Sequence, residues 1–311
     1  MQIPQIIPSR FIRRAQLAAV LIAISTSVFA GPIAGNDAAQ PAPASAPLSE
    51  LTLWNFFSEG WDQDWAKRPH PGGNPNGALL RVQTNFLERE FRTDYTYLNS
   101  NAGAKTKDIQ FLNALVAWGF NRRFMFEVIG NEQWNDFRGG GSESGTGGGA
   151  LARFQIVDTT NSSYALNLRV SLPNEGIGEE MTTLGTALAG WEDLTRFGLK
   201  RVGLYWHVQE ESFVGPGKAG ARRNDMTYAV SLAKTWTDPD VPWFGNFTTF
   251  VEAFGRTDLD GSHRGRTAIS VTPGIRITLG HGHVLMGGVD IPVSYPRNYN
   301  STFRITYIIN F

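Results

Sequence analysis

The end of the chain, STFRITYIINF, alternates between apolar and polar side chains. Successive side chains of an extended strand point to opposite faces, so this alternation predicts a strand with one apolar face and one polar face. The polar face carries Arg304. Such a strand fits a sheet that contacts an apolar medium on one side only. The apolar face consists of Phe303, Ile305, Tyr307, Ile309 and Phe311.

Short extended segments separated by turn residues recur from about residue 86 to the end of the chain. In ALNLRVSL, for example, four aliphatic residues alternate with Asn167, Arg169 and Ser171. Pro273 and Pro292 lie inside candidate segments, where a missing N–H indicates a bulge or a strand end. Twelve strands are predicted, at about residues 87–98, 108–119, 124–133, 150–158, 164–172, 183–191, 197–208, 226–236, 246–256, 267–279, 284–294 and 301–311.

The predicted strands are close to the roughly 9–11 residues that cross a bilayer at a tilt, and their number is even. Their connections alternate between a short set, such as FNRR and GHGH, and a mostly longer set, such as FRGGGSESGTGGGA. Aromatic residues gather beside both sets, for example Trp118 and Trp191 near short turns, and Trp134 and Trp206 near long loops. These features are typical of an outer-membrane β-barrel.

The terminal YIINF, with its aromatic last residue, resembles the assembly signal of Gram-negative outer-membrane β-barrels. The resemblance implies an all-β fold, a transmembrane antiparallel barrel of about twelve strands over residues 86–311, preceded by a short N-terminal extension. It also implies the barrel-assembly machinery and outer-membrane lipid as partners. In a closed barrel the last strand pairs with the first, so it can run to the final residue. A soluble β-sandwich is the alternative.

A narrower resemblance rests on NFFSEGWDQDW, GALLRVQTNFLEREFRTDYTY and ALVAWGFNRRFMFEV. These stretches resemble outer-membrane proteins of the phenol-degradation, MetA-pathway family, over most of the mature chain. The resemblance implies the movement of hydrophobic or aromatic compounds across the outer membrane. It carries over no catalytic residues.

The N-terminal part of the chain predicts export. Residues 1–30 combine a basic stretch, a short apolar run and small residues before Ala30, which is the pattern of a secretory signal peptide. A retained membrane anchor is the alternative, but the run is shorter than the ~20 residues of a spanning helix. Residues 31–50 are rich in Ala and Pro and predict a disordered spacer. Residues 51–85 form an aromatic-rich segment, either periplasmic or lumenal.

Composition narrows the function classes. Lys and Arg number 28 and Asp and Glu number 28, so the net charge is zero, which argues against a nucleic-acid partner. The chain has no Cys. After residue 30 no stretch is apolar and long enough for a transmembrane helix.

The motifs predict neither an enzyme nor a cofactor or metal site. His281 and His283 have the spacing of metal ligands, but two imidazoles do not complete a zinc site, and a tight turn is the simpler interpretation. The Gly-rich RGGGSESGTGGGA lacks the Lys of a phosphate-binding loop and predicts a surface loop. His207 and Ser212 are the one pair that could serve an outer-membrane hydrolase.

The polar faces predict the lining of the lumen, because a charge on the lipid face costs about 2–4 kcal/mol at the midplane. The charges either pair with each other and fill the lumen, or select solutes, with the arginines favouring anions. Arg276, Asp290 and Arg304 are predicted to form a cross-strand cluster. The predicted lining residues are Arg92, Asp94, Glu127, Arg153, Arg169, Arg201, Glu252, Arg276, Asp290 and Arg304.

The aromatic-rich segment supports two hypotheses. Its large rings gain much from burial, so they are not expected to form a mere tail in water. Either they pack on the periplasmic rim of the barrel, or they enter the lumen as a gate and a stacking surface for an aromatic solute. The residues concerned are Trp54, Phe56, Phe57, Trp61 and Trp65.

Together these patterns predict an outer-membrane channel for the passive passage of small molecules, with hydrophobic or aromatic compounds as the candidate solutes. The alternative from another class is a non-conducting barrel that serves as a scaffold or adhesin through its loops.

Overall fold

The protein is described from a computed structural model, over residues 48–68, 76–100, 107–137, 140–175, 181–215, 223–294 and 299–311. The predicted signal peptide and most of the predicted spacer fall in residues 1–47, which lie outside the described residues. None of the helices in the described ranges has the length and apolar character needed to cross a membrane.

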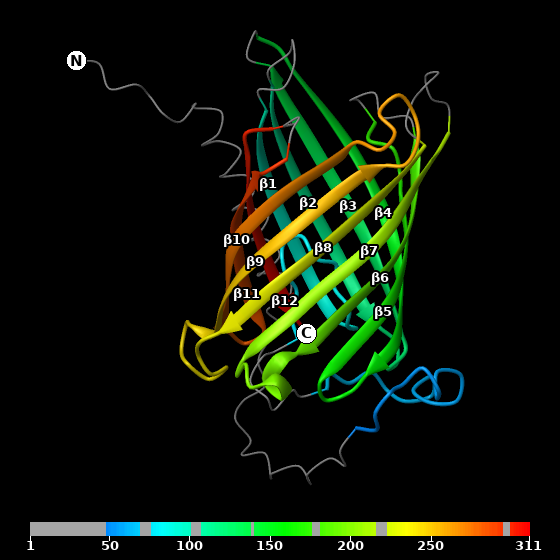
Figure 1. The fold of residues 1–311 in the computed structure, drawn as a ribbon, viewed down its shortest axis with the longest axis vertical. Coiled ribbons are helices and arrows are strands. Elements are labelled where there is room, and N and C mark those ends of the chain that lie inside the picture. The colour runs from blue at the N-terminus through cyan, green and yellow to red at the C-terminus, as the bar shows by residue number, and fades with distance from the viewer. Residues whose placement is uncertain are drawn as a thin grey trace, which may run out of the picture. The chain divides into compact units, whose positions relative to one another are not determined.

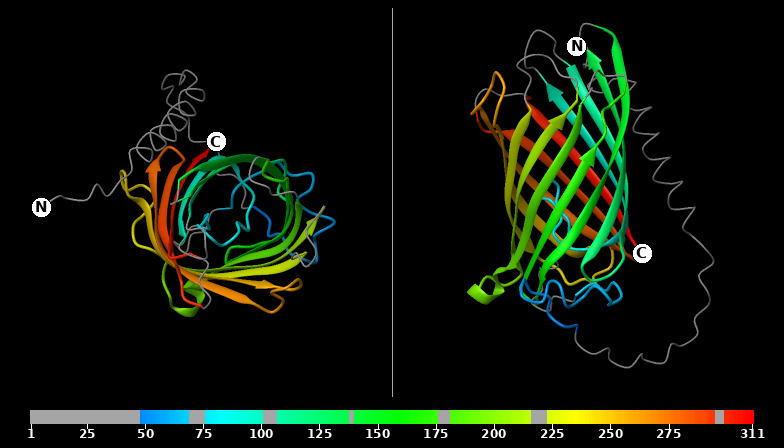
Figure 2. Two further views of the ribbon diagram at one scale, coloured as in Figure 1. Left: turned by 90° about the horizontal axis from the view of Figure 1, so that it is seen from above. Right: turned by 90° about the vertical axis from the view of Figure 1, so that its right-hand side faces the viewer.

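Residues 49–311 build a closed barrel of twelve antiparallel strands (Figures 1 and 2). Each strand pairs with its neighbours in sequence, and β1 pairs with β12 from Glu90 opposite Asn310 to Asn99 opposite Ser301. The predicted fold class and strand number are therefore confirmed. The strands are β1 (Arg89–Ser100), β2 (Lys107–Gly119), β3 (Phe124–Phe137), β4 (Ser142–Asp158), β5 (Ser162–Ser171), β6 (Thr182–Asp193), β7 (Val202–Val214), β8 (Asn224–Thr235), β9 (Gly245–Asp258), β10 (Thr267–Gly280), β11 (His283–Pro292) and β12 (Ser301–Asn310).

The Gly-rich stretch before Ala150 is strand, not the long surface loop that the sequence predicted. β4 begins at Ser142 and pairs with β3 along this whole stretch. Glycine lets backbones approach closely here: a Cβ on Gly149 would lie 2.4 Å from the carbonyl oxygen of Val170 on β5. Glycine carries neither an apolar nor a polar side chain, so a Gly-rich part of a strand shows no alternation in the sequence. This is why the first part of β4 was not predicted.

The start of β7 also differs from the prediction. Residues 197–201 were expected to be strand, but a 3₁₀ helix, η1 (Leu194–Phe197), and a turn precede Val202. The Asp193 side chain caps this helix by accepting a hydrogen bond from the Thr195 N–H at 2.9 Å. Gly198 ends it in the left-handed region, with φ of 83°.

Proline affects the strands less than predicted. Pro273 lies within β10 opposite Val251 of β9 without a register shift at that point. Toward β11, the ladder has no pair at Thr272 or Pro273, since the pairing resumes at Gly274. Pro292 is the last residue of β11, as a missing N–H favours.

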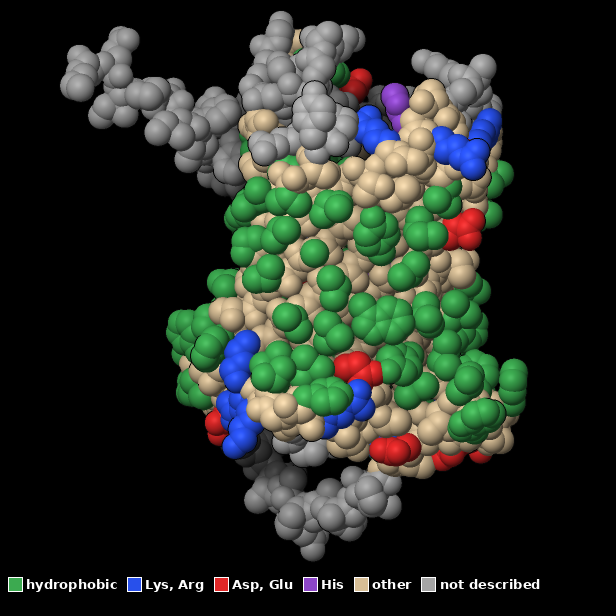
Figure 3. Space-filling view, in the orientation of Figure 1, with side chains coloured by type: hydrophobic (Ala, Val, Ile, Leu, Met, Phe, Trp, Pro, Cys, Tyr) green, Lys and Arg blue, Asp and Glu red, His purple; other side chains and the backbone are tan. Residues whose placement is uncertain are grey.

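The two faces of the barrel differ in polarity. The outer face exposes aliphatic and aromatic side chains over most of its height, as Figure 3 shows for one side. The inner face carries buried polar and charged groups on alternate positions. Exposed apolar residues of the outer face include Val116, Val128, Leu168, Leu188, Val230, Leu232, Val251, Ile275, Ile291, Phe303 and Ile305.

The chain before β1 lies at the barrel in two parts. Residues 49–68, here the rim segment, lie against the short turns: Leu51 pairs with Asp158, and Asp64 pairs with Asn121. Residues 76–88, here the lumenal segment, run inside the ring of strands, where Figure 2 shows the cyan trace that precedes β1. The lumenal segment sets the shape of the interior.

Candidate functional site in the barrel lumen

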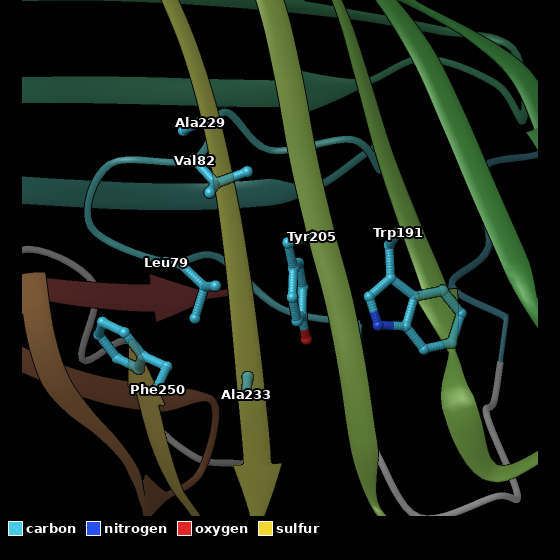
Figure 4. Close-up of a cluster of buried hydrophobic side chains, with 7 residues drawn as sticks. All are labelled: Leu79, Val82, Trp191, Tyr205, Ala229, Ala233 and Phe250. Carbon is cyan, nitrogen blue, oxygen red and sulfur yellow. The ribbon is translucent and has the colours of Figure 1, made fainter. Parts of the chain in front are cut away.

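Apolar side chains seat the lumenal segment on one wall of the barrel. Leu79 and Val82 pack against residues of β6 to β9 (Figure 4), and both are buried. The residues of the wall in this cluster are Trp191, Tyr205, Ala229, Ala233 and Phe250. Small alanines beside large rings leave room on the wall for the two aliphatic side chains.

Buried polar side chains hold the backbone at the middle of the lumenal segment. The Glu252 carboxylate, fully buried on β9, accepts the N–H groups of Arg81 and Val82 at 3.0 Å each. Nδ1 of His207, on β7, accepts the N–H of Gln83 at 3.1 Å. These contacts satisfy backbone donors that no strand reaches, as buried amides require.

The later part of the lumenal segment is fastened to β4 and β5. Arg153 donates to the Phe86 carbonyl at 2.7 Å. Gln155 and Ser163 both donate to the Asn85 carbonyl at 3.1 Å. The segment is therefore fixed from both sides, by β7 and β9 on one and by β4 and β5 on the other.

The structure places the predicted lining residues in the interior, with one exception. Arg92, Asp94, Glu127, Arg153 and Arg169 line one cavity. Glu252 contacts the lumenal segment, Asp290 and Arg304 line another cavity, and Arg276 lines one nearer the short turns. Arg92 and Asp94 form an ion pair at 2.8 Å.

Arg201 is the exception, and its prediction is wrong. It lies in the turn between η1 and β7 with φ of 59°, and it forms an ion pair with Asp238 of another short turn. The predicted strand began too early, so the inward position assigned to Arg201 does not exist.

The predicted cluster around Asp290 forms with a different member. Asp290 Oδ2 contacts Arg304 at 2.8 Å and Arg81 of the lumenal segment at 3.2 Å. Thr272 donates to its other oxygen at 2.6 Å. Arg276 lies farther along β10, opposite Met286, and donates to the Ala78 carbonyl at 3.3 Å.

The five aromatic residues predicted as a lumenal gate belong to the rim segment. Trp54 and Phe57 are 94% and 93% exposed in the rim segment, outside the ring of strands (Figure 1). The Arg89 guanidinium lies over the Trp65 ring, 4.9 Å from its centroid. The Trp65 indole N–H donates to the Leu87 carbonyl at 3.2 Å. The gate hypothesis is therefore wrong for Trp54 and Phe57, whereas Trp65 packs against a buried cluster that includes Leu87 and Met125. The lumen is narrowed by residues 76–88 instead.

Cavities remain on both sides of the lumenal segment. One of about 260 Å³, between the segment and β9 to β12, is lined by Arg81, Phe254, Tyr299 and Arg304 among others. A second of about 200 Å³ adjoins β1 to β5 and shares Arg81. A third of about 260 Å³ lies toward the short turns, beside Arg276.

The first cavity combines a ring with charge. The Arg81 guanidinium lies over the Phe254 ring, 3.6 Å from its centroid. Among the described residues that line this cavity, Arg81 and Arg304 share the carboxylate of Asp290, and Arg256 is paired with the buried Asp225 behind it. The arrangement offers positive charge and aromatic contact together.

Sequence reasoning left residues 51–85 as either periplasmic or lumenal, and it did not single out Arg81, Gln83 or the structural role of His207. Leu79, Leu80 and Val82 were the available signal, because they are apolar residues just before the first strand. They have no strand or helix period: Leu79 and Val82 are buried in one cluster on the wall, and Leu80 beside them is partly buried.

Two of the described histidines, His207 and His283, have hydrogen-bond partners. Nδ1 of His207 is occupied by the Gln83 amide, and Ser212 donates to Asn224 at 2.9 Å, so the two do not form a pair. His281 lies in the β10–β11 turn with φ of 49°, and His283 contacts Tyr307 at 2.6 Å. Within the described residues, no group of His, Cys, Asp and Glu could hold a metal ion.

Comparisons with known proteins agree on the fold. No protein-family model matches the chain, and no curated protein matches it in sequence. The COG4313 outer membrane channel from Pseudomonas putida F1 is similar in structure, with a TM-score of 0.55 and 10% identity, over 74% of this chain and 98% of that one. The NanC porin is similar with a TM-score of 0.47 and 11% identity, over 72% and 98%. At these identities the likeness concerns the barrel fold.

Proposed function

We propose that the protein is an outer-membrane channel for the passive passage of small molecules. The observation that carries the proposal is the contrast between an apolar outer face and a charged interior that retains cavities beside the lumenal segment. In a bilayer only helices or closed barrels satisfy every backbone group, and this barrel is closed. The short turns would face the periplasm, as in other outer-membrane barrels.

We infer further that the solutes are small and aromatic or hydrophobic, as the resemblance to the MetA-pathway family implies. The cavity beside Phe254 supports this, because about 150 Å³ is already enough for a benzene ring, and this cavity has about 260 Å³. Arg81 and Arg304 share one carboxylate, Asp290, and this excess of positive charge favours solutes that also carry a negative charge.

The alternative is a non-conducting scaffold. It is supported by the lumenal segment, which strands on opposite walls hold in place. Loop length argues against a scaffold or adhesin. The connection between β3 and β4 was predicted to be long, but it comprises only residues 138–141.

Planar-bilayer recording and solute uptake separate the two functions. A channel gives discrete conductance steps, and a strain that lacks the protein takes up small aromatic carboxylates more slowly than the complemented strain. A folded, heat-modifiable barrel that shows neither conductance nor an effect on uptake is a scaffold. Purification as a soluble monomer without detergent would contradict both functions.

A further inference from the structure

The rim segment presents large apolar side chains to its surroundings. Trp54 is 94% exposed and Phe57 is 93% exposed, and Leu53 beside them is 62% exposed. Aromatic rings bury 150–250 Å² each in typical interiors, so two rings left in water forgo a large burial gain. Contiguous exposed apolar groups of this kind mark a contact with a protein or a membrane.

The rim segment is held in shape by polar contacts and not by these rings. Arg123, buried in the β2–β3 turn, donates to Asn55 Oδ1 at 2.7 Å and to the Glu59 carbonyl at 2.8 Å. Its guanidinium also donates to the carbonyls of Gln155 and Ile156, at 2.9 Å each. The arginine thus ties the rim segment to β4, and the rings project from a fixed support.

A chain of rings connects the rim segment with the outer face of the barrel. Phe57 and Phe56 are 5.1 Å apart between centroids, and Phe56 and Trp61 are 5.6 Å apart. Trp61 then contacts Phe154 at 6.5 Å. Phe154 contacts Phe124 at 5.2 Å, and both alternate with buried inward residues on β4 and β3. The exposed rings therefore continue the apolar outer face.

The rim segment carries charges of both signs along with its rings. It contains Glu50, Glu59, Asp62, Asp64, Lys67 and Arg68. In Figure 3 the projecting lower right of the molecule shows hydrophobic side chains, with acidic side chains along its lower edge. A hydrogen bond to the Ser49 side chain lowers the pKa of Glu59, so this carboxyl is ionised at neutral pH. Exposed apolar side chains and exposed charged side chains on one short segment suit a water–lipid boundary.

We propose that Leu53, Trp54 and Phe57 insert into the headgroup region of the leaflet at the short-turn end of the barrel. The rim segment is then an interfacial anchor that widens the aromatic belt beyond the strands. This inference rests on the membrane location put forward above. Trp and Tyr rings settle at headgroup level because one end is apolar and the other can stay hydrated.

Site-directed spin labelling tests the anchor, because the chain has no Cys that would have to be removed. Single variants Trp54→Cys and Phe57→Cys are labelled, refolded into phosphatidylcholine vesicles and compared by their accessibility to oxygen and to a water-soluble nickel chelate. Val230→Cys, on the outer face of β8 and 47% exposed, is the lipid control. Asp62→Cys, exposed in the rim segment, is the water control. Each variant is used only if it shows the heat-modifiable migration of the folded barrel.

Labels at positions 54 and 57 should be shielded from the nickel chelate relative to position 62, at a depth shallower than position 230. If positions 54 and 57 match position 62 while position 230 lies in lipid, the anchor is refuted and the membrane location stands. If position 230 is also in water, the membrane location itself fails. Because the vesicles contain no other protein, shielding of positions 54 and 57 beyond that of position 62 is assigned to lipid.

Discussion

Asp290 balances two arginines that approach it from different directions. Its carboxylate is fully buried and contacts Arg81 and Arg304, which are themselves largely shielded. Removing one partner of a buried ion pair costs about 3–5 kcal/mol when the remaining charge stays dry. The neighbouring cavity lets water reach these arginines, so a smaller cost, about 2 kcal/mol, is expected here.

Asp290→Ala should therefore lower the free energy of unfolding and increase the preference of the pore for anions. Urea unfolding in detergent measures the first effect, and reversal potentials in a salt gradient measure the second. Asp238→Ala is the matched control, because its ion pair with Arg201 is exposed and such pairs contribute about 0–1 kcal/mol. Equal effects of the two variants would show that the ion pairs of Asp290 contribute no more to stability and selectivity than an exposed pair does.

Single contacts in the lumen were only partly predictable. Alternation correctly indicated that Asp290 and Arg304 face inward, but it does not fix which inward residues are neighbours. A register change of two residues keeps every side chain on its face and changes every partner, which is why Arg276 was wrongly assigned to Asp290. Arg81 was out of reach because it belongs to no strand.

At the scale of elements, the lumenal segment depends on one carboxylate more than on any other polar group. Glu252→Ala removes the acceptor of the Arg81 and Val82 amides. Hydrogen bonds to a charged group contribute about 1.5–3 kcal/mol, so local opening should become at least roughly tenfold more frequent. Hydrogen–deuterium exchange of peptides that cover residues 76–88 measures this opening directly.

Glu210→Ala is the control for loss of a glutamate, since Glu210 is exposed on β7 and the exchange of the lumenal segment should not change. Unaltered exchange in Glu252→Ala would mean that the apolar contacts of Leu79 and Val82 suffice to hold the segment.

The Gly-rich part of β4 gives a second prediction at this scale. Gly149→Ala should weaken the barrel by about 1–3 kcal/mol, as overpacking does, because its Cβ would lie 2.4 Å from a backbone oxygen of β5. Gly130→Ala on β3 is the matched control, since nothing lies within 4 Å of its Cβ. The temperature at which the folded band disappears on gels compares the two, and equal temperatures would contradict the close approach of β4 and β5.

Most strands could be predicted because each buries one face, which leaves a period of two in the sequence. β12 and β5 are examples, with aliphatic and aromatic residues at every second position. The period of two does not identify a strand where glycines replace larger side chains, as in β4 before Ala150. It also misleads where an apolar residue lies in a turn, as Phe197 does in η1. It also fails for the lumenal segment, whose contacts follow the shape of the wall and not a repeat.

At the scale of the whole molecule, closure depends on the pairing of β1 with β12. The Phe311 N–H donates to the Arg89 carbonyl at 3.0 Å, and its ring lies 5.8 Å from that of Trp118 on β2. The last residue thus links β12 to the two strands on the other side of the closure. An aromatic pair of this kind contributes about 0.5–1.5 kcal/mol beyond the area it buries.

Phe311→Ala tests whether this end also directs assembly, as its resemblance to the outer-membrane assembly signal implies. Loss of the ring pair should lower the stability of the refolded barrel by about 1 kcal/mol, measured by urea unfolding in detergent. If the terminal residue is also recognised during assembly, the amount of folded barrel in the outer membrane should fall much further than this small loss explains. Phe303→Ala is the control, because Phe303 lies on the same face at the other end of β12 and is 42% exposed, close to the 46% of Phe311. If both variants reach the membrane in equal amounts, Phe311 acts only through packing and the assembly role is refuted.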